Sequence, residues 1–210
     1  MPAALGFPTR PRLARVALGL PPEIIPPRTH VLLLVYLDDT PWIADAGFGA
    51  GYVPPMPLQD GAIVSSSDGA THRLRRTGQP GDLSSEWLLE RRGPVAAMDG
   101  RAAQHEDWQP QYGFDLSPVA PDDLEQCNHW TSTRADTRFL TLAIVSIVLP
   151  DGFATMTDRR LSIYRGGASE VREIEDVKDY HALVANLFGL AVSADDVAAL
   201  PLSSPPLSET

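Results

Sequence analysis

Apolar residues along the first two-thirds of this 210-residue chain occur in short runs that are typical of β-strands. Residues 30–37, HVLLLVYL, are almost continuously apolar and rich in branched side chains, which predicts a strand buried on both faces. Residues 42–49, WIADAGFG, follow after Asp38 and Asp39, a pair suited to a two-residue hairpin turn. The pattern therefore predicts an antiparallel hairpin near the start of the chain.

The rest of the chain contains further strand patterns and then a helical one. We expect strands at THRLRRT, EWLLERR and FLTLAIVSIVL, a short helix starting in SPVAPDDLEQC, and a second hairpin in GFATMTDRRLSIYRGG. Near the end, apolar residues recur at the i, i+3, i+4 spacing of one helix face: Val177, Tyr180, Leu183, Val184, Leu187 and Phe188. Gly189 is a candidate C-cap of this helix, and Ser193 is a candidate N-cap of a short terminal one. The pattern predicts an antiparallel β-barrel or sandwich followed by an α/β tail.

Composition and charge exclude several classes of protein. Hydrophobic residues make up 43% and charged residues 21%, as in ordinary globular domains. The net charge of −10 disfavours a nucleic-acid partner, because phosphates would be repelled. The one cysteine, Cys127, permits no internal disulfide, and no metal site is indicated. No apolar run reaches the roughly 20 residues of a membrane span, and we expect a cytoplasmic protein without a membrane partner.

Two polar residues in the first predicted hairpin need an explanation, since a core strand requires neither. A two-residue turn places His30 opposite Gly47 and Asp45 opposite Leu32. His30 and Asp45 are then diagonal neighbours on one face, about 7–8 Å apart at the backbone and within side-chain reach. A carboxylate that orients an imidazole is half of a nucleophile-activating triad. The same spacing also arises when a histidine merely begins a strand and an aspartate caps a turn, and a one-residue slip would separate the two side chains.

Several linked motifs follow one another along the chain. Thr29-His30 opens a strand, the sequence DAGFG follows at residues 45–49, and YGFDLSPVAPDDLEQCN spans residues 112–128. The next segment, NHWTSTRADTRF, contains Trp130, Ser132, Thr133 and Phe139. In order and spacing these motifs resemble those of the arylamine N-acetyltransferase family from about residue 3 to residue 200, and the family has an aromatic residue, Ser-Thr and Phe at the last four positions.

The resemblance implies a chemistry and a set of site residues. Family members use a Cys-His-Asp triad to take an acetyl group from acetyl-CoA as a thioester and pass it to an arylamine, a hydrazine or a related acceptor. On this chain the resemblance implies His30 as the base and Asp45 as its orienting group. Further implied residues are Phe48, Gly47 and Gly49 for the acceptor, and Thr29, Trp130 and Thr133 for CoA or the cleft.

The sequence departs from the family pattern at the nucleophile. The family's cysteine lies in an Arg-Gly-Gly-x-Cys motif on an N-terminal helical domain, and that motif does not occur in these 210 residues. Cys127 lies in a segment that the family does not use for the nucleophile, and a lone cysteine is typically a small buried hydrophobe. The resemblance therefore implies an α+β fold, an antiparallel β-barrel followed by an α/β lid, that lacks the N-terminal helical domain.

The expected division of the chain follows from the same resemblance. We expect residues 1–28 to be a remnant of an N-terminal region, residues 29–139 to form the β-barrel, residues 140–202 to form the lid, and residues 203–210 to be a disordered tail. His72, in THRLRR, is expected on the surface of a strand.

Three functional hypotheses remain open from the sequence. The first is an N-acetyltransferase by descent that is inactive as this chain. The second is a non-catalytic remnant or binding module that pairs with a separate N-terminal half or forms a homo-oligomer. The third is another Cys-His-Asp protein, such as a transglutaminase-like one.

Overall fold

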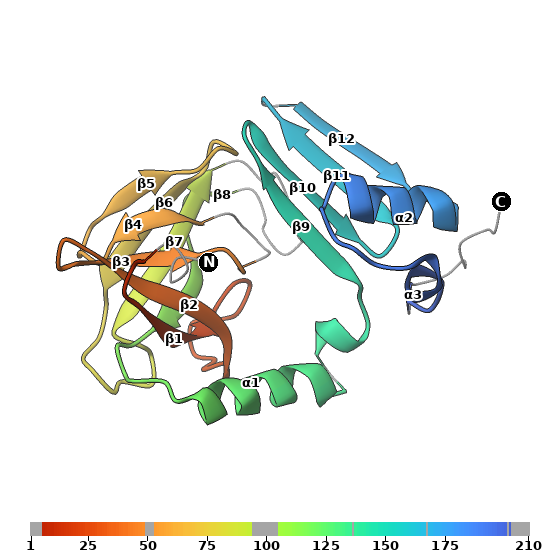
Figure 1. The fold of residues 1–210 in the computed structure, drawn as a ribbon. Coiled ribbons are helices and arrows are strands. Elements are labelled where there is room, and N and C mark those ends of the chain that lie inside the picture. The colour runs from red at the N-terminus through yellow and green to blue at the C-terminus, as the bar shows by residue number, and fades with distance from the viewer. Residues whose placement is uncertain are drawn as a thin grey trace. The chain divides into compact units, whose positions relative to one another are not determined.

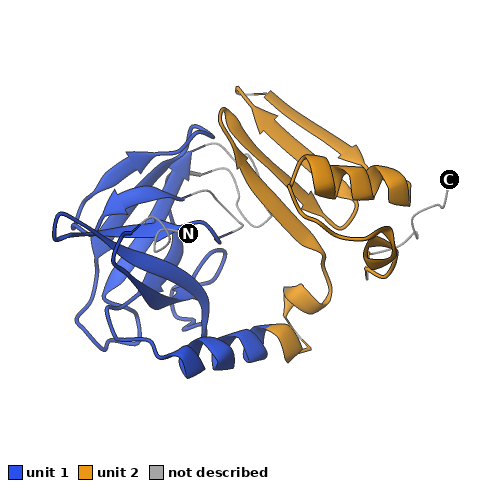
Figure 2. Cartoon of the chain, viewed as in Figure 1, with its two compact units in different colours: residues 1–131 blue, residues 132–210 orange. Residues whose placement is uncertain are grey.

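The computed structural model describes residues 6–48, 53–93, 105–135, 137–166, 168–200 and 202, with side chains omitted at 105, 106 and 138. The chain divides into two compact units, residues 1–131 and residues 132–210 (Figures 1 and 2). Each unit has its own sheet and its own apolar core, so each is considered by itself.

The first unit is built on an eight-stranded antiparallel sheet in the order β4-β3-β2-β1-β8-β7-β6-β5. Its strands are β1 (Thr9–Val16), β2 (Arg28–Leu37), β3 (Thr40–Asp45), β4 (Val53–Pro57), β5 (Ile63–Ser65), β6 (Thr71–Arg76), β7 (Trp87–Gly93) and β8 (His105–Phe114). The two edge strands, β4 and β5, contact each other, so the sheet curls toward a barrel. The expectation of a mainly antiparallel, barrel-like sheet is confirmed.

The β2–β3 hairpin has the predicted two-residue turn. Asp38 and Asp39 both have positive φ, 47° and 62°, as a type I′ turn requires. Paired residues run from Leu37 opposite Thr40 to Leu33 opposite Ala44, which is the register expected from the sequence. This register places the beginning of β2 beside the end of β3, where the candidate site lies.

An apolar core fills the inside of the curled sheet. Its largest fully buried side chains come from several strands: Leu32, Leu34, Ile43, Met56, Leu74, Leu89, Tyr112 and Phe114. Burying a large apolar side chain is worth about 1.5–3 kcal/mol, so these positions hold the strands in place. β2 and β8 both contribute to this core, and they also carry His30 and Tyr112.

A buried polar cluster lies at the β5–β6 turn and the neighbouring β7, and we call it the Asp68 cluster. It consists of Ser66, Asp68, His72 and Arg91, each less than 8% exposed. Asp68 accepts a hydrogen bond from Ser66 and pairs with Arg91 at 2.9 Å, while Ser66 Oγ lies 3.2 Å from His72 Nε2. The expectation that His72 lies on the surface is therefore wrong. Its imidazole is buried and lies within hydrogen-bond distance of the Ser66 hydroxyl.

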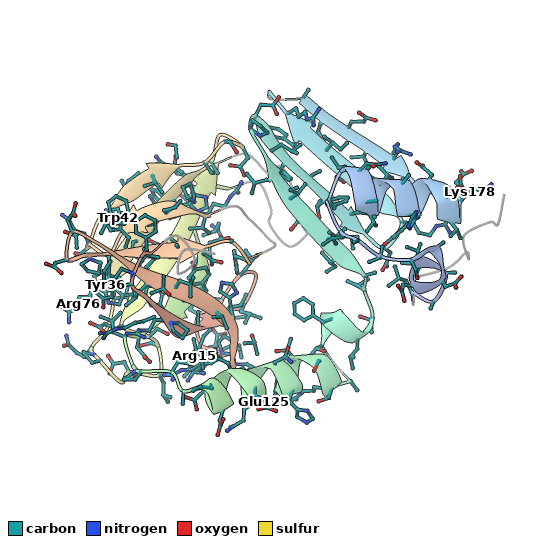
Figure 3. The ribbon with its side chains drawn as sticks, viewed as in Figure 1. Arg15, Tyr36, Trp42, Arg76, Glu125 and Lys178 are labelled. Atoms are coloured by element: carbon teal, nitrogen blue, oxygen red, sulfur yellow. The ribbon has the colours of Figure 1, made fainter. Side chains whose placement is uncertain are left out.

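Helix α1 (Pro121–Thr133) follows the sheet of the first unit and has no buried residue. Pro121 is its first residue, where a missing N–H costs nothing and the fixed φ suits a helix. Glu125 on this helix projects into solvent (Figure 3). The short helix predicted to start in this segment is confirmed.

The second unit has a four-stranded antiparallel sheet in the order β12-β11-β10-β9. Its strands are β9 (Ile144–Leu149), β10 (Gly152–Thr157), β11 (Arg160–Arg165) and β12 (Ala168–Glu173), after a 3-10 turn at Arg138–Leu140. Helices α2 (Val177–Asn186) and α3 (Ala194–Ala198) pack on this sheet through Tyr180, Val184 and Val197. The predicted β10–β11 hairpin and both terminal helices are confirmed, and Ser193 caps α3 in a capping box.

The predicted division into segments 1–28, 29–139, 140–202 and 203–210 stays a prediction. Residues 203–210 lie outside the described residues, and β1, within the first segment, pairs with both β2 and β8. None of the described helices is long and apolar enough to cross a membrane. Among the residues that the structure describes, no three His, Cys, Asp or Glu side chains are grouped so that they could hold a metal ion.

Candidate active site

His30 and Asp45 form a close hydrogen-bonded pair at the base of the β2–β3 hairpin. His30 Nε2 lies 2.6 Å from Asp45 Oδ2, the length of a strong charge-assisted bond. The other carboxylate oxygen accepts a hydrogen bond from the backbone N–H of Gly47 at 3.0 Å. The Asp45 side chain is fully buried and that of His30 is 11% exposed, so the carboxylate is held rigidly while the imidazole keeps some access to solvent.

Two aromatic rings pack against the His30 imidazole. The ring centroids of Phe48 and Tyr112 lie 5.1 Å and 5.0 Å from that of His30. The two rings also contact each other edge to face, at 4.9 Å. Such packing restricts rotation of the imidazole and lowers the local polarity, because Phe48 and Tyr112 are both buried. Phe48 therefore lies beside the predicted base, as part of the wall around it.

Tyr112 is a member of this group for which sequence reasoning assigned no role. Burial raises its pKa well above the usual value, and the negative charge of Asp45 raises the pKa further. Its hydroxyl makes no hydrogen bond of ordinary geometry with the described residues. The phenol therefore stays neutral beside the Asp45 carboxylate. The signal for it in the sequence was the YGF motif, which fixed its position on the chain but not its neighbours.

The pair has the arrangement that a general base requires. Because Nε2 donates its proton to Asp45, Nδ1 carries the lone pair of the neutral imidazole. Within the described part of the chain, Nδ1 has no hydrogen-bond partner. It is therefore available to accept a proton from a thiol or hydroxyl placed beside it, and the carboxylate would stabilise the imidazolium that forms.

The remaining predicted site residues lie at several places in the structure. Gly47 is exposed and anchors Asp45, and Thr29 is half-buried on β2 beside His30. Gly49 lies outside the described residues. Trp130 and Thr133 both lie on α1, Trp130 within the first unit and Thr133 within the second. Their roles stay predictions.

Cys127 is a half-buried residue in the middle of α1. Burial raises the pKa of its thiol, the nearby Asp123 carboxylate raises it further, and Arg28 acts weakly in the opposite direction. A catalytic cysteine needs the reverse, a lowered pKa next to an imidazole. His30 is not among the groups that influence this thiol.

The fold and the pair together define a class of protein: a barrel-like antiparallel sheet that holds a histidine hydrogen-bonded to an aspartate, an arrangement that suits nucleophilic catalysis. Comparison with known proteins shows which family within this class the chain resembles. The N-acetyltransferase family model matches residues 3–197. The chain is 36% identical over 191 residues to the arylamine N-acetyltransferase of Escherichia coli (strain K12), which covers 90% of this chain and 61% of that protein.

Solved structures agree with the sequence comparison. The arylamine N-acetyltransferase from Salmonella typhimurium superposes with a TM-score of 0.79 at 30% identity, covering 94% of this chain and 69% of that one. The Mycobacterium marinum enzyme in complex with CoA gives a TM-score of 0.72 at 26% identity, over 93% of this chain and 66% of that one.

The chain belongs to the arylamine N-acetyltransferase family. It spans about 61% of the length of the Escherichia coli relative.

Proposed function

We propose that this chain supplies the base and its orienting group to an N-acetyltransferase site, His30 as the general base and Asp45 as the residue that positions it. The observation that carries the proposal is the 2.6 Å bond from His30 Nε2 to Asp45, which leaves Nδ1 open for a thiol. Acetyl-CoA and an arylamine are the substrates, by analogy with the related enzymes. Phe48, packed on His30, would form part of the wall against the aromatic acceptor.

The chemistry is a double displacement. A thiol gives its proton to His30 Nδ1, and the thiolate attacks the acetyl carbonyl and releases CoA, which takes that proton from His30. The amine then attacks the thioester and gives a proton to His30 Nδ1. The acetyl group passes to the amine nitrogen as the thiolate is released, and His30 returns the proton to the thiol. Each step needs a base with the correct tautomer, which the Asp45 carboxylate provides.

We further propose that the 210-residue chain alone does not transfer acetyl groups, because Cys127 cannot serve as the nucleophile. Its thiol has a raised pKa and lies on α1, without a contact to His30. The nucleophile would then come from polypeptide beyond these 210 residues, bearing the Arg-Gly-Gly-x-Cys motif. Thr29, Trp130 and Thr133 would bind CoA, and the second unit would act as the lid.

The test has two parts. First, purified chain is incubated with acetyl-CoA and aniline, and we expect no acetanilide above the uncatalysed background. Second, the chain is fused to an N-terminal segment that bears the family's Arg-Gly-Gly-x-Cys motif, and we expect activity to appear. In the fusion, His30→Gln should abolish turnover and Asp45→Asn should lower kcat by about 10²–10⁴-fold.

Matched controls keep the test specific. His181→Gln changes a histidine of the second unit that bonds to the carbonyl of Val192, and Asp107→Asn changes an exposed carboxylate, so both should leave kcat unchanged. Turnover by the chain alone that Cys127→Ala abolishes would refute the assignment of the nucleophile. Equal activity of the His30→Gln fusion would refute the role of His30.

A second candidate function, a binding module that pairs with a separate N-terminal half, is favoured by one surface feature. The loop between β1 and β2 exposes Leu20, Ile24 and Ile25 by 41%, 52% and 50%, and Val31 beyond it by 40%. Exposed apolar groups of this kind commonly mark interfaces. Co-expression with the Cys-bearing segment as a separate chain tests it: a stable complex that Ile24→Asp disrupts supports pairing, and two chains that elute apart contradict it. The family match favours both candidates over a transglutaminase-like protein.

A further inference from the structure

A cavity of about 250 Å³ lies within the second unit, between the β9 end of its sheet and the two terminal helices. Ile144 and Val145 of β9 form one side, and Val184 of α2 and Val197 of α3 form the other. The cavity continues the apolar core of this unit and opens to solvent on one side. Every residue that lines it belongs to the second unit, whereas His30 and Asp45 belong to the first.

The size of the cavity limits what it can hold. Pockets for drug-sized ligands measure about 300–1,000 Å³, and a dry apolar cavity of about 150 Å³ binds benzene. A volume of 250 Å³ lies between these values. It therefore fits a molecule with one ring and a short substituent, and it is too small for a folded peptide segment.

Nearly all residues that line the cavity are aliphatic, so the cavity favours a ligand that is largely apolar. The charged residue that lines the cavity is Asp196, which is exposed. Asp196 Oδ2 accepts hydrogen bonds from Ser193 N and Oγ at 3.1 and 2.7 Å, while Oδ1 has no partner among the described residues. The hydrogen bonds from Ser193 lower the pKa of Asp196, so its carboxylate is ionised at neutral pH. A free carboxylate oxygen beside an apolar cavity favours a ligand that has a hydrogen-bond donor and disfavours an anion.

We propose that this cavity is a binding site for a one-ring aromatic molecule with a short donor-bearing substituent, an amine, seated among Val145, Val184 and Val197 with its donor toward Asp196. The proposal is independent of acetyl transfer and of the His30–Asp45 pair.

Methyl NMR of the full chain labelled at Val and Leu tests the site, with benzylamine as the probe and toluene and benzoate as comparison ligands. We expect benzylamine to shift the methyl signals of Val145, Val184, Val197 and Leu200, with a Kd on the order of 1 mM for so small a ligand. Toluene should bind several-fold more weakly, and benzoate more weakly still. Absence of shifts at 20 mM benzylamine, or equal binding of benzoate, would overturn the proposal.

Variants that fill the cavity locate the binding. Ala143→Leu adds three carbons to the lining at a half-buried position and should weaken benzylamine binding at least tenfold, and Val192→Phe serves the same purpose if the first variant fails to fold. Val171→Leu, on the exposed strand β12, is the matched control and should bind as the original chain does. Unchanged binding in both folded filling variants would refute the site.

Two further measurements test the role of the Asp196 carboxylate and the alternative that a second copy of the chain covers the cavity. Asp196→Asn keeps a capping side chain for α3 and should reduce benzylamine affinity to that of toluene, with toluene binding unchanged. Sedimentation of the free chain tests whether a second copy covers the cavity. A dimer that Ala143→Leu dissociates would assign the cavity to an interface between copies and overturn the ligand proposal.

Discussion

Removal of the Asp68 carboxylate is the sharpest test of how the first unit is held together. Asp68 accepts hydrogen bonds from Ser66 Oγ and from the backbone N–H of Ala70, the latter at 3.1 Å, and pairs with Arg91 at 2.9 Å. Asp68→Ala deletes the acceptor for all three donors. The Arg91 guanidinium then keeps its charge in a buried position without the carboxylate that faces it.

The expected loss of stability is large because both partners are buried. The side chains of Asp68 and Arg91 are only 2% and 7% exposed. Breaking a buried ion pair by removing one partner costs about 3–5 kcal/mol, whereas replacing both partners by apolar groups costs much less. Asp68→Ala should therefore reduce the free energy of unfolding by about 3–5 kcal/mol, and Arg91→Met in the same chain should restore part of that loss.

Tryptophan fluorescence during urea unfolding measures this loss of unfolding free energy in the first unit, which contains Asp68. All four tryptophans, at positions 42, 87, 108 and 130, belong to residues 1–131. Asp107→Ala, which removes an exposed carboxylate from the same unit, is the control and should change stability by less than about 0.5 kcal/mol. A loss from Asp68→Ala no larger than that of the control would refute the reasoning.

The contribution of the Asp68 carboxylate to stability should depend on pH in a direction that follows from its pKa. Burial alone would raise the pKa of Asp68, but the hydrogen bond from Ser66 and the charge of Arg91 outweigh it, and the folded pKa lies below the ordinary 3.8. Its contribution to stability is therefore fully present above the unfolded pKa and is lost as the pH falls through the lower, folded pKa. The stability difference between the original chain and Asp68→Ala should shrink below pH 4, and a difference that grows on acidification would contradict the assignment.

Three further predictions concern single groups in either unit. Burial raises the pKa of Tyr112 well above its usual value and that of Tyr180 to about 12. Titration at 295 nm should therefore show at least two of the five tyrosines un-ionised at pH 10.5, and full ionisation there would disprove this. Gly152→Ala places a methyl group 1.9 Å from a backbone oxygen of the neighbouring strand, and thermal melts by circular dichroism should show a loss of at least about 2 kcal/mol, against none for the exposed control Ser169→Ala. Burial raises the pKa of Cys127, so its reaction with a thiol reagent at pH 8 should be slower in the folded chain than in urea, and an equal rate would be inconsistent with that.

Local sequence determined the hairpin on which the candidate site is built. A two-residue Asp-Asp turn has one favoured geometry, and once the turn is set the two-residue period of the strands decides which side chains face each other. For this reason the register from Leu37–Thr40 to Leu33–Ala44, and the proximity of His30 to Asp45, could be predicted before the structure was known. The amphipathic stripe of α2 and the Ser193 cap of α3 are local signals of the same kind.

Only the tertiary structure determines which residues from distant parts of the chain pack against these elements. Tyr112 reaches His30 because β8 pairs with β1, which itself pairs with β2, and no local pattern specifies such a pairing. His72 looked like a surface residue within its own strand, but the curled sheet encloses it with the Asp68 cluster, where burial makes polar partners necessary. Contacts between neighbours in the chain depend on backbone geometry that the residue types encode, whereas contacts across the sheet depend on how all eight strands close around a common core.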